Sequence, residues 1–90
     1  MLIEQVAQRL QTKPEVLERD SLKLYLEKKL RVIESELFLL AHRYGVRDVT
    51  ELDDMIKQGR FHEDEAFENY FNFDYLEHER DKLSQLLEDL

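Results

Sequence analysis

The sequence predicts an all-α protein, a helical hairpin built around one long central helix, and two observations support this. Only two Gly and one Pro occur among 90 residues, of which 38% are charged, a balance typical of long helices. Apolar residues also recur at spacings of four and three, which places them in one narrow stripe of a helix. They are Leu26, Leu30, Ile33, Leu37, Leu40 and Tyr44. A chain of this length forms a single domain with a modest core.

The first elements expected are a short amphipathic helix over residues 1–11 and a long helical segment over residues 13–44. Between them, Thr12 stands three residues before a glutamate, with a proline in the first turn, which marks a helix start. Asp20-Ser21 either re-cap the chain or occupy exposed helix positions, so the long segment is one helix or two. Gly45 is expected to end it in the left-handed conformation.

A short connecting helix is expected over residues 51–58, with Thr50 as its cap, and Gly59 ends it. A C-terminal helical segment follows over residues 63–90, which contain no Gly or Pro. Its apolar face changes direction near Asn72. The helix therefore kinks or restarts there, or its aromatic residues meet a different partner from its leucines.

The leucine stripe of the C-terminal segment contains Leu76 and Leu83, whereas three aromatic residues point to nearly the opposite side. One interpretation is a core beneath the short helix, with Leu52 and Met55 facing the aromatic rings. The other is a second contact with a partner. Its candidate interface residues are Phe67, Tyr70 and Phe71. Arg80 lies inside the leucine stripe, so its guanidinium needs an acid or an exit to solvent.

A second apolar row on the long segment consists of Tyr25, Val32 and Leu39, which repeat every seven residues. This row is typical of an oligomer seam, and we take its three members as candidate interface residues. Two hairpins joined there would form a homodimer with an antiparallel four-helix arrangement. The alternative is that the helix over residues 1–11 folds back and covers the row within the same chain.

Charge is divided unevenly along the chain. Residues 1–45 hold eight Lys/Arg and seven Asp/Glu, whereas residues 46–90 hold five and fourteen. The acidic half disfavours nucleic acid as a partner and favours a basic protein surface. No apolar run is long enough to span a membrane, the N-terminus has no signal-peptide pattern, and there is no Cys. We therefore expect a soluble cytoplasmic protein without a membrane partner.

Catalytic motifs are scarce. The sequence has no Gly-rich phosphate loop, no nucleophile elbow and no zinc-protease motif, so we predict no catalytic residues, metal or cofactor and a non-enzymatic interaction protein. The alternative is a small metal-dependent or hydrolytic enzyme that uses His42, His62 and His78 with nearby carboxylates. That alternative requires at least two of the histidines to converge.

Three stretches resemble small helical prokaryotic proteins of the antitoxin type. They are Leu39-Leu40-Ala41-His42-Arg43-Tyr44-Gly45-Val46, then Thr50-Glu51-Leu52 with Gly59, and Asp74-Tyr75-Leu76-Glu77. In such families a long helix ends in a tyrosine-glycine pair, and a short capped helix and an acidic C-terminal helix follow. Many members carry a tryptophan near the last stretch, and this chain has none. The resemblance implies a protein that neutralises a basic toxin with its acidic helical surface.

Overall fold

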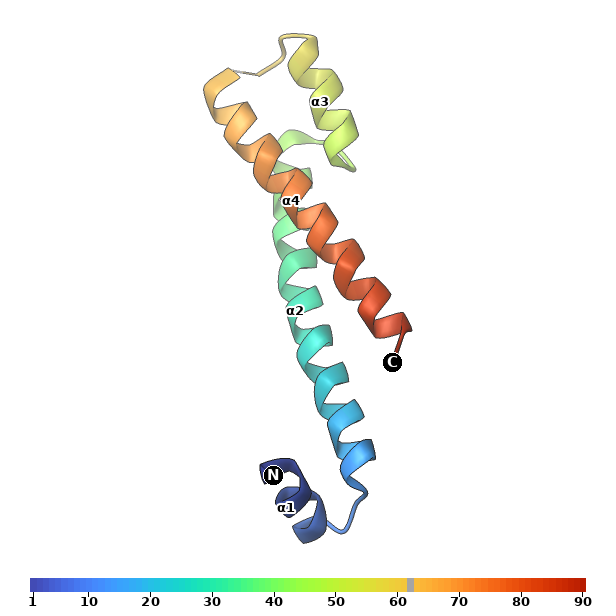
Figure 1. Cartoon of the computed structure of the whole chain (residues 1–90). Coiled ribbons are helices and arrows are strands. Elements are labelled where there is room, and N and C mark those ends of the chain that lie inside the picture. Colours follow the sequence, from blue (N-terminus) through green and yellow to red (C-terminus); the bar gives the residue numbers. More distant parts are fainter. Residues whose placement is uncertain (62) are drawn as a thin grey trace.

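The described residues form four α-helices in a rod of 60 × 19 × 19 Å. The structure is a computed structural model that describes residues 1–61 and 63–90. The helices are α1 (Leu2–Arg9), α2 (Pro14–Tyr44), α3 (Val49–Lys57) and α4 (Glu63–Glu88). Figure 1 shows α4 returning along α2, with α3 at the closed end of the hairpin and α1 at the other end of α2. The all-α helical hairpin predicted from the sequence is confirmed.

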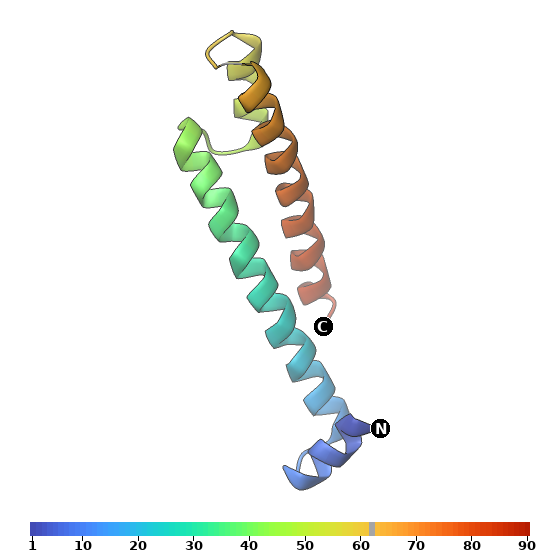
Figure 2. The ribbon, with the colours of Figure 1, turned by 90° about the vertical axis from the view of Figure 1, so that its left-hand side faces the viewer.

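The core lies between α2 and α4, and it uses the stripe predicted on the long helix. Leu37 and Leu40 of α2 are buried against Phe73 and Leu76 of α4, with Ile33 and other partly buried residues packed around them. Leu83 is buried two turns beyond this cluster. Since α4 is shorter than α2, it ends well before the N-terminal end of α2 (Figure 2). The hairpin is therefore closed by α3 at one end, whereas at the other end α2 extends beyond α4 and is accompanied only by α1.

Helix α3 closes the core at the end of the hairpin, where Val46, Val49 and Leu52 are buried. Its N-cap is Asp48, whose Oδ1 accepts a hydrogen bond from the backbone N–H of Glu51 at 2.9 Å. The predicted Thr50 cap is wrong, because α3 begins at Val49, two residues earlier than expected. Thr50 therefore lies in the first turn, and Asp48, with an extended backbone, occupies the N-cap position.

The long helix α2 runs through Asp20-Ser21 without a break, so the segment is one helix. It begins at Pro14, whose fixed φ suits the first helical position. The predicted Thr12 cap is wrong, because Lys13 occupies the N-cap position and Thr12 lies one residue too early. Gly45 ends the helix at φ 67° and ψ 36°, in the left-handed conformation that was expected of it.

Helix α4 also continues through Asn72 as one helix. The apparent change of face there has a simple origin, because Phe73 lies three residues before Leu76 and extends the leucine stripe toward the closed end. The buried face of α4 is thus continuous from Ala66 to Leu83, and the aromatic residues outside it point elsewhere. Arg80 is half-buried on this face, and its Nε donates to Asp81 Oδ1 at 3.1 Å, so its head group leaves toward solvent.

Candidate association surface

Outside the stripe that packs against α4, the surface of α2 carries five exposed large apolar residues, of which Phe38 borders a hollow shared with Phe73 and Arg80 of α4. The predicted row is exposed, at 58% for Tyr25, 54% for Val32 and 64% for Leu39. Leu24 and Phe38 lie beside it, at 68% and 69% exposure. We call these five residues the outer face of α2. Leu24 and Phe38 were not predicted as interface residues, although each lies seven residues from Arg31, a spacing that places them in a second row beside the first.

Helix α1 does not cover the outer face. Ile3 and Ala7 point inward and Ala7 is fully buried, but α1 lies beside the N-terminal part of α2 (Figures 1 and 2). The interpretation that residues 1–11 fold back over Tyr25, Val32 and Leu39 is therefore wrong. The reason is the tight connection, in which Gln11 adopts φ 58° and the N–H of Thr12 donates to Ala7 O at 2.9 Å.

Charged side chains border the outer face without covering it. Lys29 Nζ lies 5.4 Å from the ring centroid of Tyr25, close enough for a cation–π contact. The ring of His42 stacks on that of Phe38, with centroids 6.1 Å apart and an interplanar angle of 9°. Two shallow hollows lie along the face, one beside Tyr25 and one beside Phe38. The outer face is therefore hollowed at two places.

The aromatic candidates on α4 divide between the core and the surface. Tyr70 packs against the core cluster, and its ring meets that of Phe71 edge to face at 5.4 Å. Phe67 and Phe71 are exposed, and so is Tyr75, which was not predicted. The core beneath α3 contains Leu52 and Met55 as one interpretation expected, but its aromatic members are Phe73, Tyr70, Phe61 and Tyr44 of α2.

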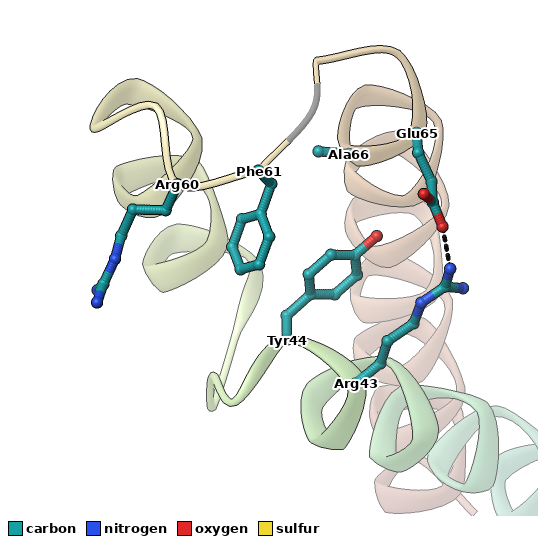
Figure 3. Close-up of a pocket in the computed structure, with 6 residues that line it drawn as sticks. All are labelled: Arg43, Tyr44, Arg60, Phe61, Glu65 and Ala66. Carbon is teal, nitrogen blue, oxygen red and sulfur yellow. Dashed lines mark hydrogen bonds and ion pairs between the residues drawn. The ribbon is translucent and has the colours of Figure 1, made fainter.

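A hollow at the closed end joins α2 to α4 and is drawn in Figure 3. It is lined by Arg43, Tyr44, Arg60, Phe61, Glu65 and Ala66. Arg43 forms an ion pair with Glu65, and the rings of Tyr44 and Phe61 meet edge to face at 5.0 Å. Figure 3 shows Arg60 pointing away from these groups. Because the charge of Arg43 is matched by Glu65, the hollow is a structural joint between the two long helices.

The histidines lie in unrelated settings. His42 stacks on Phe38 of α2, whereas His78 of α4 has Nδ1 2.8 Å from the backbone oxygen of Asp74. That hydrogen bond and the Asp74 carboxylate raise the pKa of His78 above its usual value. His62 lies outside the described residues. Within the described ranges, no three His, Cys, Asp or Glu residues gather in a group that could hold a metal ion.

Nothing in the described part of the chain is a helix both long and apolar enough to cross a membrane. Comparison with known proteins gives a match to a protein-family model that extends over residues 1–90. No curated protein and no solved structure matches the chain.

Proposed function

The chain belongs to the uncharacterized protein MJ0235 family, and we propose that it is a non-enzymatic protein–protein interaction protein. In this proposal it forms a dimer of identical chains through the outer face of α2. The observation that carries the proposal is the exposure of Leu24, Tyr25, Val32, Phe38 and Leu39 on one side of one helix. A cluster of this kind on a small protein is typical of an interaction site.

Covering the apolar area of the outer face offsets most of the free-energy cost of forming a dimer. Each of the five side chains is more than half exposed, so covering it stabilises the pair by about 1 kcal/mol. Ten such side chains, five from each copy, contribute roughly 10 kcal/mol, which is comparable to the ~4–15 kcal/mol lost on association. Contacts around the rim then determine the net affinity.

Charge favours a second copy on α2 and disfavours one on α4. Residues 14–44 hold six Lys/Arg and six Asp/Glu, whereas residues 63–88 hold two and nine. Two copies of α2 therefore approach as neutral helices, but two copies of α4 would bring together strongly acidic helices. Since the outer face lies outside the stripe of α2 that packs against α4, a dimer through this face has the α2 helices, and not the acidic α4 helices, at its centre.

Sedimentation velocity over a range of concentrations tests the proposal, with Val32→Glu as the disrupting variant. The wild-type protein is expected to be dimeric at high micromolar concentration, and Val32→Glu monomeric. Val16→Glu is the matched control, because Val16 lies on the same helix at 45% exposure but outside the outer face. A monomeric wild-type protein would overturn the proposal, and so would equal effects of the two variants.

A basic protein partner and an antitoxin-type role stay predictions beside this proposal. The acidic half of the chain, with Phe67 and Phe71 exposed on α4, supports a basic partner. The measurement is co-expression with the product of the neighbouring gene. Rescue of growth and co-purification are expected, and failure of both would contradict the antitoxin role without affecting the dimer.

A further inference from the structure

Three apolar residues of the outer face are spaced symmetrically about Val32. Tyr25 lies seven residues before it and Leu39 seven residues after it, and all three are more than half exposed. Leu24 and Phe38 form a second row, whose midpoint is Arg31, one residue from Val32. An apolar row that presents the same spacing when it is reversed end to end suits an isologous pair of antiparallel helices, in which the same patch serves both copies.

Two hollows border the outer face, one on each edge. Tyr25 and Lys29 line the first, and Arg31 and Phe38 line the second. A helix that lies along the outer face therefore meets a hollow on both of its sides.

We infer, resting on the proposed function, that the two copies lie antiparallel along α2 with the two-fold axis beside Val32. In this arrangement Tyr25 contacts the partner's Leu39, Leu24 contacts the partner's Phe38, and the two Val32 side chains meet. The contacts occur twice because of the symmetry, so all five residues of the outer face are covered.

Rim charges suit this register. Lys29 and Glu36 lie on one edge of the outer face and are both exposed, and the antiparallel pair places Lys29 near the partner's Glu36 on both sides of the axis. On the other edge the two Arg31 side chains approach each other, and each has Glu27 and Glu34 one turn away on its own helix as counter-charges.

The distribution of charge between the two ends of the hairpin separates the antiparallel from the parallel arrangement. The closed end carries α3 and the start of α4, which belong to the half with fourteen Asp/Glu and five Lys/Arg. A parallel pair would place the two acidic ends side by side. An antiparallel pair places them at opposite ends of the assembly, next to the less charged half of the partner. The opposed dipoles of the two α2 helices also favour the antiparallel arrangement.

Disulfide cross-linking tests the register directly, because the chain has no Cys of its own. Tyr25→Cys and Leu39→Cys are prepared as separate chains, one of them with a mass tag, and oxidised alone and mixed. The mixture is expected to form a cross-link between the two kinds of chain. Tyr25→Cys alone is not, because the two copies of residue 25 lie ~21 Å apart along the helices, beyond the reach of a disulfide.

The outcomes separate this inference from the proposed function. A cross-link in Tyr25→Cys alone would show a parallel pair and overturn the register, while the dimer through α2 would stand. A dimeric protein that cross-links in neither experiment would also overturn the register. A wild-type protein that is monomeric in sedimentation velocity would overturn the proposed function and this inference with it.

A charge exchange is the second measurement and requires no cross-linking. Lys29→Glu and Glu36→Lys each place like charges together in their homodimers, and each is expected to weaken self-association roughly tenfold. A mixture of the two variants restores opposite charges at both sites, so a heterodimer is expected at wild-type concentrations. If neither variant weakens the homodimer, Lys29 and Glu36 do not face each other and the register is wrong.

Discussion

Replacing Phe73 by Ala is expected to destabilise the hairpin by about 3–5 kcal/mol, the range for an aromatic residue removed from a packed core. Phe73 is 1% exposed and is one of the two largest fully buried side chains, packed in a cluster with Leu37, Leu40 and Leu76. The loss combines the transfer of the ring with the cavity left between α2 and α4. For a chain of this size it corresponds to a fall in Tm of roughly 15–30 °C.

The matched control is Phe71→Ala, the same substitution two residues earlier on the same helix. Phe71 is 66% exposed, so its removal is expected to cost less than about 1 kcal/mol. Urea unfolding followed by circular dichroism at one protein concentration measures both variants, because association would otherwise contribute to the apparent stability. Equal losses in the two variants would refute the assignment of Phe73, rather than Phe71, to the buried face of α4.

Three further predictions concern single groups. Asp48→Ala is expected to cost about 1 kcal/mol of unfolding free energy through loss of the α3 cap, whereas Thr50→Ala stays within ~0.5 kcal/mol, as urea unfolding would measure. Gly45→Ala is expected to cost about 1–2 kcal/mol in the same assay, because its φ is positive although the space around it is open; an unchanged stability would contradict this conformation. Because the pKa of His78 is raised by the Asp74 carbonyl and carboxylate, its contribution to stability is present below the ordinary histidine pKa and lost as pH rises through the raised value. In an NMR titration, Asp74→Asn is expected to lower that pKa partway, since the carbonyl remains, and no change would remove the carboxylate as a cause.

The parts of the fold that depend on helical periodicity could be predicted from the sequence. The stripe through Leu37 and Leu40 is buried as expected, and so are Leu76 and Leu83 opposite it. The face of α4 near Asn72 was harder, because exposed and buried aromatic residues alternate there, and spacing alone does not say which ring enters the core. Packing against α3 determines which aromatic ring of α4 is buried.

The cap of α3 was missed for a related reason. Both Asp48 and Thr50 are residue types that cap helices, and local sequence does not distinguish them. The backbone N–H of Val49 donates to Glu77 Oε2 at 3.0 Å, which ties the first turn of α3 to α4. This contact joins residues far apart in the chain, so it was not available to a local pattern.

The candidate surface was predicted in part. The seven-residue spacing of Tyr25, Val32 and Leu39 identified one row of the outer face, but the second row with Leu24 and Phe38 was overlooked because Arg31 interrupts it. Whether the chain covers its own row depends on where α1 lies. A connection of a few residues, in which Gln11 has a left-handed backbone, directs α1 to the end of α2. The spacing of apolar residues along a helix does not predict the direction in which the next helix runs.

The difference in length between α2 and α4 predicts a gradient of hydrogen-exchange protection along the rod. Near the closed end, amide groups of α2 open only when the packed core opens, so their exchange should be slow. Toward the N-terminal end, where Leu22 and Leu24 remain substantially exposed, only α1 accompanies the helix and local fraying should exchange the amides quickly. An antiparallel partner would cover this fraying segment with the C-terminal part of its own α2, so dilution that separates the copies should accelerate exchange most in that segment.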